Sequence, residues 1–508
     1  MDLLSRVPVR ASAAAPEERP ARLPSARLWV AVSFAAMAAL GAWLLIRPAL
    51  GGRPYYRIGQ DKTTFDYDVQ LVLILIPYGM ALWAWWRGSR VPLWALLAGA
   101  AVLHTLVLFA PLLQSQDFYQ YLFYGKMQAL HHVNPYVARP IAFPRDPWLA
   151  WVRWPDQPSV YGPLWMLVTL AVAKVAGPSL SVGFVALKMV ILAADVAVAA
   201  LILVIARGSD DPAGRAGWGV LLFLWNPLVF VNVPLGGAVD VVIAATFLGA
   251  YLADRRDRPM LATVLLTAAS LLKIYAGVAL LLYAVVLARR RGWRLGALHA
   301  LVAASVASVA YLPYWSGVAV FRGVAEATTL TNVSLSGTLQ RLVVPILHAA
   351  GSGRTHLAQR LVHLTAGAAL LAVVAWAIHR AWEKRALWPV LVGALFAYLV
   401  ITPWFLPWYV IAPLALVAVL PRNRLTLPLI VFAATSLAVL WDPVSTSDWV
   451  FVSLIHYVPP AAVYAWELLR ERAMARRPVV RVLPPGPEVR GPSALPTPGS
   501  VTWEPAAK

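Results

Sequence analysis

The chain has 508 residues, of which 60% are hydrophobic and only 13% are charged, and it contains no cysteine. A soluble globular protein needs far less apolar sequence for its core, so this composition predicts a polytopic membrane protein. The lack of cysteine excludes disulfides, a thiolate nucleophile and a cysteine-based metal site. The formal net charge is +20, but the basic residues stand in short clusters between apolar runs and in the two tails. This distribution indicates orientation in a membrane and argues against a nucleic-acid partner.

The predicted elements begin with a lead over residues 1–27 that is rich in Ala, Pro and Arg. It lacks the order of a cleaved signal peptide and is predicted to be a disordered cytoplasmic N-terminus. Residues 28–471 then form the predicted membrane domain. Its apolar runs lie at 28–46, 68–86, 91–113, 161–177, 183–206, 216–233, 238–253, 261–288, 295–312, 359–378, 386–420, 425–441 and 449–468.

A bilayer core needs about 20 residues of helix, and shorter spans are tolerated inside a bundle, so we expect about 12 to 14 helices. The tail at 472–508 is rich in Arg and then in Pro, and it is predicted to be disordered and cytoplasmic. The fold class is therefore all-α, a polytopic transmembrane helical bundle.

Clusters of basic residues between the runs predict the orientation, because such clusters stay on the cytoplasmic side. The run at 261–288 is basic at both ends and is therefore predicted to be a hairpin, with its turn around Lys273 near the outer face. The loop 114–160 is placed outside by the same count. The count closes only if 161–177 or 183–206 is re-entrant or steeply tilted, and the shorter run is the one expected to be so.

The external loop carries the most unusual sequence, a polar and aromatic stretch that opens with Asp117. Asp117 stands just beyond a membrane-length run, where it suits either a helix N-cap or a catalytic base. Residues 117–132 carry an apolar stripe and are predicted to form an amphipathic helix in the membrane interface. Tyr121 and Tyr124 on this helix would stack on a sugar or anchor the helix.

Other polar and aromatic residues, far apart in sequence, are predicted to meet Asp117 at the outer face. They are Lys126, Asp156, Asp240, Lys273, Trp404 and Trp408. Ionisable groups at membrane depth are costly, so a convergent set predicts a functional site. Snorkelling or an aromatic belt is the alternative for each residue, and an ion pair with Asp240 is the alternative for Lys273.

The adjacent residues His131 and His132 have no accompanying ligand spacing. They therefore predict no metal site, and the sequence predicts no cofactor.

Five segments, in this order, resemble the GT-C superfamily of polyprenyl-phosphate-sugar glycosyltransferases: DFYQYLFYGKMQALHHVNPY, WPDQPSVYGPL, WNPLVFVNVPLGGAVD, SLLKIYAGVALLLY and TPWFLPWYVIAPLALV. Within it they are most similar to the bacterial alpha-mannosyltransferase branch that includes the actinobacterial enzymes of phosphatidylinositol mannosides and lipomannan. The resemblance implies a helical bundle with external juxtamembrane helices and a catalytic Asp at the start of its first large external loop. The matching residue is Asp117.

The resemblance also implies roles for other residues. Lys126 or Lys273 would hold the donor phosphate. Substrate contacts are expected from Tyr121, Tyr124, Asn134, Tyr136, Asp156, Tyr161, Asp240, Trp404 and Trp408. Asn134 and Tyr136 also suit the turn that ends the amphipathic helix, since a residue before proline leaves helical geometry. Asp156 is the alternative base.

The chain departs from the family pattern at three positions. Phe118 follows Asp117, Trp154 stands before the Pro-Asp pair, and Gly162 replaces the first of two prolines. These departures do not change the expected reaction type, but the family pattern then no longer indicates which sugar or which acceptor is used.

A phosphate monoester is a good leaving group and needs no general acid, so one carboxylate base and one cation suffice for the transfer. Glycosidases use two carboxylates because their leaving group is poor. The resemblance implies inverting transfer of a sugar, with mannose favoured, from a polyprenyl phosphate to a lipid or glycan hydroxyl outside the cell membrane, and this leaving-group chemistry agrees with it. The alternative is a multi-pass transporter or lipid flippase, which predicts inverted repeats that are not seen between the two halves.

Overall fold

The structure, a computed structural model, describes residues 26–50, 71–108, 117–328, 330–349, 355–384, 386–440 and 445–475. These residues are mainly helical, and the part of the chain that is described contains no β-strand. This confirms the prediction of an all-α polytopic protein. The predictions for residues 1–25, for the start of the loop at 114–116 and for most of the tail lie outside the described ranges.

The chain divides into two units, residues 1–464 and 465–508. The structure describes little of the second unit, namely the last turns of the helix α20 (Thr446–Ala475). All the packing described below belongs to the first unit.

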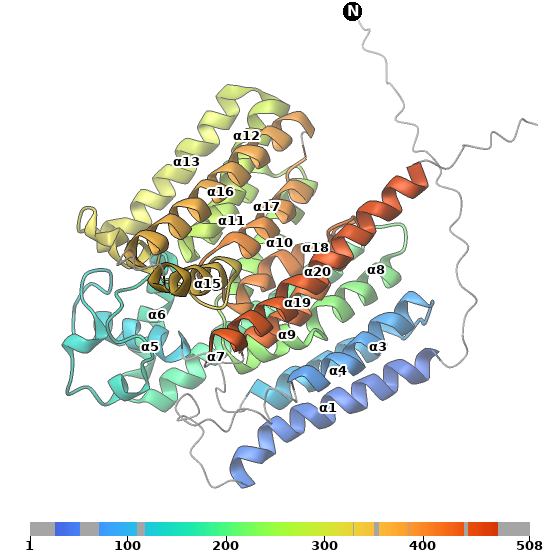
Figure 1. The fold of residues 1–508 in the computed structure, drawn as a ribbon, viewed down its shortest axis with the longest axis horizontal. Coiled ribbons are helices and arrows are strands. Elements are labelled where there is room, and N and C mark those ends of the chain that lie inside the picture. The colour runs from blue at the N-terminus through green and yellow to red at the C-terminus, as the bar shows by residue number, and fades with distance from the viewer. Residues whose placement is uncertain are drawn as a thin grey trace, which may run out of the picture. The chain divides into compact units, whose positions relative to one another are not determined.

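The first apolar runs form three helices, drawn in blue in Figure 1, of which the first packs against the other two. They are α1 (Ala26–Leu50), α3 (Leu75–Trp86) and α4 (Leu93–Leu108). Their bounds follow the predicted runs where those runs are described.

The external loop folds onto α5 (Asp117–Ala129), which packs against α6 (Pro163–Ala176) and α7 (Leu180–Ala206). Two short 3-10 helices, η1 (Pro140–Ala142) and η2 (Pro147–Trp151), lie in the loop and also contact α5. The side chains from Phe118 to Met127 are therefore nearly all buried. The predicted helix is present but ends at Ala129, and its polar side chains Gln120, Tyr124 and Lys126 contact the loop. Its position in the membrane interface stays a prediction.

The run at 216–233 is broken rather than continuous. It forms α8 (Pro212–Gly219) with η3 (Val220–Leu224), then α9 (Pro227–Phe230) with η4 (Val231–Leu235), and the two parts are bent by 52°. Proline has no N–H and disfavours helical geometry in the residue before it, so Pro227 ends the first part. The Asn226 side chain accepts a hydrogen bond from the Leu228 amide and begins the second part.

The predicted hairpin at 261–288 is confirmed. Helix α10 (Asp240–Arg255) leads to α11 (Pro259–Leu272), the 3-10 turn η5 (Ile274–Ala276) and α12 (Gly277–Arg291). Arg291 at the end of α12 forms an ion pair with Asp257, which lies just before α11. The two basic ends therefore meet, and Lys273 lies at the opposite end of the hairpin.

The remaining elements complete the bundle, in which α11, α12, α13, α16 and α17 pack side by side (Figure 1). They are α13 (Trp293–Tyr311), η6 (Leu312–Tyr314), η7 (Ala319–Phe321), α14 (Arg322–Ala327), α15 (Leu335–Ala349), α16 (Thr355–Lys384), α17 (Trp388–Ile401), η8 (Pro407–Val410), α18 (Ile411–Val419), α19 (Thr426–Thr435) and η9 (Ser436–Leu440).

Among the described residues, four helices are long and apolar enough to cross a membrane, and the bent pair would make a fifth span. The other apolar helices have 10–17 residues. A helix of 17 residues is about 26 Å long, which is shorter than a bilayer core of about 30 Å. Helix α6, with 14 residues, is among them. The number of crossings and the re-entrant character of the run at 161–177 stay predictions.

Candidate active site

Asp117 is the first residue of α5 and is only 9% exposed. Its Oδ2 accepts a hydrogen bond from the Tyr161 hydroxyl at 3.2 Å. Burial raises the pKa of the Asp117 carboxyl above its ordinary value, although the positive charge of Lys273 and hydrogen bonds from Tyr161 and Trp154 partly oppose this. A raised pKa makes the ionised form of a buried carboxyl a stronger base than an ordinary exposed carboxylate.

Asp240 and Lys273 form a second buried group. The Lys273 Nζ lies 2.6 Å from Asp240 Oδ2, and the Tyr275 hydroxyl donates to Asp240 Oδ1 at 2.9 Å. Asp240 begins α10 and is fully buried, while Lys273 follows the last residue of α11 with extended backbone angles. Both oxygens of the carboxylate are thus occupied, which is what a buried charge requires.

Tyr161 joins the two groups. Its hydroxyl donates to Asp117, and its ring centroid lies 5.6 Å from the Lys273 ammonium. The Tyr409 ring covers the same ammonium at 4.7 Å. The structure therefore brings together Asp117, Tyr161, Asp240 and Lys273, four of the residues expected at the site.

Gly162 lets the end of the external loop pack closely against the backbone just before Lys273. Its N–H donates to the Leu272 carbonyl at 2.9 Å, and a Cβ at this position would lie 2.1 Å from the Leu271 carbonyl oxygen. Proline could not donate this bond, so the departure from the family pattern at Gly162 has a structural reason. The contact places Tyr161 beside the residue that precedes Lys273.

We therefore expect Gly162→Ala to destabilise the protein by about 1–3 kcal/mol, because the added methyl group overpacks a backbone contact that cannot move freely. The melting temperature in detergent and the transferase activity should both fall. Gly367→Ala is the matched control, since a Cβ at Gly367 meets nothing within 4 Å. Equal melting temperatures for the two variants would contradict this account of Gly162.

The second half of the loop is held to α5 by side-chain amide and hydroxyl groups. The Gln120 side chain donates to the Trp154 carbonyl at 3.1 Å and accepts from the Trp154 amide at 3.2 Å. The Tyr124 hydroxyl donates to the Gln157 carbonyl at 2.9 Å. The neighbouring residue Asp156 is exposed, so it is less suited than Asp117 to act as a sheltered base.

Trp154 also contacts the turn after α17. Its ring packs edge-on against Trp404 with centroids 5.6 Å apart. Trp408 lies further along the same turn, 5% exposed, and its indole N–H finds no hydrogen-bond partner among the described residues. The role of Trp408 in substrate binding stays a prediction.

Lys126 contacts Asp146 and Trp148 of the external loop and not the Asp117 group. Its ammonium lies 2.7 Å from Asp146 Oδ1 and 4.3 Å from the Trp148 ring centroid. His131 Nε2 lies 2.8 Å from Asp146 Oδ2. Burial alone would raise the pKa of the Asp146 carboxyl, but hydrogen bonds from Lys126, the Trp148 amide and His131 hold it below its ordinary value. The role of Lys126 at the donor phosphate stays a prediction, and the contacts favour Lys273 for it.

Asn134 and Tyr136 hold loops together. The Asn134 amide donates to the Tyr314 carbonyl at 2.7 Å, and the Tyr136 hydroxyl donates to the Tyr161 carbonyl at 2.7 Å. Tyr121 is buried with its ring edge-on to Tyr161, the centroids being 4.8 Å apart. Within the described ranges, no group of three or more His, Asp or Glu side chains is arranged to hold a metal ion.

Comparison with known proteins decides the family. The family model described as alpha-(1->6)-mannopyranosyltransferase, N-terminal domain, matches residues 26–289, just over half of the chain. The chain belongs to this family. A curated relative, alpha-(1->6)-mannopyranosyltransferase A of Mycobacterium tuberculosis, is 27% identical over 453 residues, which cover 80% of this chain and 83% of the relative. No solved structure matches the chain.

Membership confirms the resemblance to the GT-C mannosyltransferases and makes this chain a membrane mannosyltransferase. The matched range contains Asp117, Tyr161, Asp240 and Lys273. Trp404 and Tyr409 lie beyond it. The buried charged groups of the candidate site therefore fall within the part of the chain that defines the family.

Sequence reasoning missed two tyrosines of this site, Tyr275 and Tyr409. Tyr275 stands two residues after Lys273, but the sequence alone does not show that its hydroxyl reaches Asp240. Tyr409 directly follows Trp408. The prediction named Trp408, but it is the Tyr409 ring that lies over the Lys273 ammonium.

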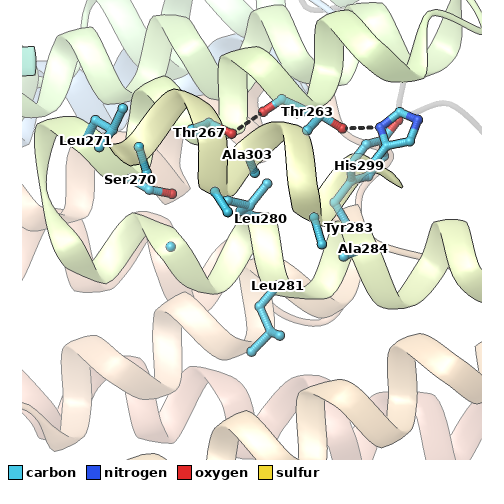
Figure 2. Close-up of a pocket in the computed structure, with 14 residues that line it drawn as sticks. Thr263, Thr267, Ser270, Leu271, Leu280, Leu281, Tyr283, Ala284, His299 and Ala303 are labelled. Atoms are coloured by element: carbon cyan, nitrogen blue, oxygen red, sulfur yellow. Dashed lines mark hydrogen bonds between the residues drawn. The ribbon is translucent and has the colours of Figure 1, made fainter. Parts of the chain in front are cut away.

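A cavity of about 350 Å³ lies between α11, α12 and α13. Figure 2 shows Ser270 and Leu271 at one end of it and Tyr283 and His299 at the other. Several polar side chains of its lining are hydrogen-bonded within the protein: Ser270 donates to the Leu266 carbonyl at 2.8 Å, Thr267 donates to the Thr263 carbonyl at 2.8 Å, and Thr263 and His299 hydrogen-bond to each other at 2.6 Å. The rest of the lining is mainly Leu, Ala and Gly, so the cavity is largely apolar. Leu271, at one end of it, stands two positions before Lys273 in the sequence.

Proposed function

We propose that this mannosyltransferase takes mannose from a polyprenyl phosphate and transfers it, with inversion, to a lipid or glycan hydroxyl at the outer face of the cell membrane. The observation that carries the proposal is the joining of the buried Asp117 carboxyl to the buried Asp240–Lys273 pair through Tyr161. One group is suited to take a proton, and the other holds a cation in place.

In the proposed step the acceptor oxygen attacks C1 of the mannose while Asp117 takes the hydroxyl proton. The bond from C1 to the phosphate oxygen breaks, and the phosphate monoester leaves with the electron pair. Lys273 lies close enough to affect the ionisation of Asp117 and would neutralise the charge that grows on the leaving phosphate. A single displacement of this kind inverts the configuration at C1.

Asp240 would hold the Lys273 ammonium in place before the donor arrives. The ammonium donates to Asp240 at 2.6 Å and lies against the rings of Tyr161 and Tyr409. These contacts leave part of its donor capacity for a phosphate oxygen, since an ammonium carries three N–H donors.

The apolar cavity supports a lipid donor. A hydrocarbon chain suits a cavity lined mainly by Leu and Ala side chains, whereas a nucleotide would leave most of its polar atoms unpaired there. Three residues of the lining, Ser270, Leu271 and Gly277, lie just before and just after Lys273 in the chain. A lipid in the cavity would therefore have its phosphate end near the Lys273 ammonium.

The arginine clusters support the external placement. Arg290 and Arg291 form ion pairs with Asp254 and Asp257 at the end of the α11–α12 hairpin opposite Lys273. Basic clusters of this kind stay on the cytoplasmic side, so the lysine end would face outward.

The test is transfer of labelled mannose by membranes that contain the protein, supplied with either a polyprenyl-phosphate mannose or a nucleotide-linked mannose. We expect the lipid-linked donor alone to support transfer. Ala303→Phe should raise KM for this donor by about tenfold, because the ring fills the cavity that the chain would occupy. Transfer from the nucleotide donor, or movement of the intact lipid across the bilayer without transfer, would contradict the proposal.

A further inference from the structure

Lys188 is a fully buried lysine in the first third of α7. Within the described ranges its ammonium is paired with no carboxylate and donates instead to the carbonyls of Pro234 and Leu235, at 2.5 and 2.7 Å. A buried ammonium is costly, so a lysine at this position calls for a reason beyond packing.

The two carbonyls are the last ones of η4, the second half of the broken helix. The carbonyls of Asn232 and Val233 just before them accept hydrogen bonds from the amides of Ala238 and Gly237. Those of Pro234 and Leu235 are among the final carbonyls of a helix, which have no partner within the helix itself. Lys188 supplies the donors, and its positive charge also suits the negative end of the helix dipole.

The turn after η4, which Lys188 holds, packs against Phe118, the residue that follows Asp117. Gly237 has a φ of +70°, and a Cβ there would stand 2.3 Å from Cδ2 of Phe118. The Lys188 ammonium is itself 5.5 Å from the Phe118 ring centroid. Glycine alone therefore fits the turn, and the same ring contacts both the turn and the lysine.

Three residues beyond Gly237 the chain reaches Asp240, the partner of Lys273. A shift of the turn would thus move Asp240 relative to Phe118, which is covalently next to Asp117. We propose that Lys188 is a positioning residue for mannose transfer. By hydrogen-bonding the last carbonyls of the broken helix, it holds the Gly236–Asp240 turn in place and so sets the position of the Asp240–Lys273 pair relative to Asp117. The inference rests on the proposed function of that cluster.

The experiment compares Lys188→Met, which keeps the length of the side chain, with Lys188→Arg, which keeps its charge and donors. At equal amounts of folded protein, Lys188→Met should lower kcat by about 10- to 10²-fold while KM for polyprenyl-phosphate mannose stays near that of the wild type, because misplacement of catalytic groups acts on the transition state. Lys188→Arg should recover much of the rate. Lys174→Met, at an exposed position of α6, is the matched control and should remain active.

A second readout is independent of turnover. The chain has no cysteine, so Ala238→Cys adds a single thiol inside the turn, where Ala238 is 1% exposed. Adding Lys188→Met to this variant should speed labelling by a membrane-permeant thiol reagent by at least about fivefold, because local opening becomes easier. Adding Lys174→Met should leave the labelling rate unchanged.

The outcomes separate this inference from the proposed function. Wild-type kcat and an unchanged labelling rate for Lys188→Met would overturn the inference, as would an arginine variant no better than methionine when both are folded. Full activity of Asp117→Asn would instead overturn the proposed function, and the labelling experiment would still decide whether Lys188 holds the turn.

Discussion

Asp117→Asn is expected to lower the rate of mannose transfer by about 10²- to 10⁴-fold, the loss that follows removal of a positioned general base. Asparagine has nearly the same shape and can still accept the hydrogen bond from the Tyr161 hydroxyl, which is 3.2 Å from Asp117 Oδ2 in the native protein. The variant should therefore fold and bind donor as the wild type does. The measurement is the initial rate of transfer from labelled polyprenyl-phosphate mannose.

Asp156→Asn is the matched control for this substitution. Asp156 belongs to the same external loop but is exposed, and the hydrogen bonds that hold its segment come from the neighbouring residues Trp154 and Gln157. We expect this variant to keep most of its activity. If Asp156→Asn lost activity and Asp117→Asn kept it, the base would be the exposed carboxylate and the role of Asp117 would be wrong.

The sequence was sufficient to predict the helical class and the end of the hairpin at Lys273. Apolar runs give helices, and basic residues at both ends of one run require a turn between them. The Asp257–Arg291 ion pair confirms that turn. The break in the run at 216–233 was missed, although Asn226 followed by Pro227 carries the signal of a helix start.

The pairing of the charged residues could not be predicted from sequence spacing. Lys126 and Asp146 meet because the external loop folds back over α5, and that return depends on the turns η1 and η2 rather than on any periodic pattern. Asp240 and Lys273 were named as possible partners because both lie at predicted outer turns. Lys188 gave no signal beyond its charge in a mainly apolar helix.

Lys273→Met is expected to lower the transfer rate by at least about 10²-fold, because the cation beside the leaving phosphate is lost. It should also change the dependence of the remaining rate on pH. Lys273 lowers the pKa of Asp117 in the native protein, so its removal raises that pKa further. Asp117 acts as a base only when ionised, and the acid limb of the pH–rate profile should therefore move to higher pH.

The single variant leaves Asp240 buried and unpaired, which costs about 3–5 kcal/mol when a buried ion pair is broken from one side. Lost activity by itself would then not distinguish a missing phosphate contact from local unfolding. Lys273→Met combined with Asp240→Asn removes both charges, and replacement of a whole buried pair is much less destabilising. The double variant should regain the melting temperature of the wild type but not its transfer rate. Recovery of the rate as well would mean that Lys273 serves to neutralise Asp240, and that the donor phosphate is held by another cation, for which Lys126 would be the first to test.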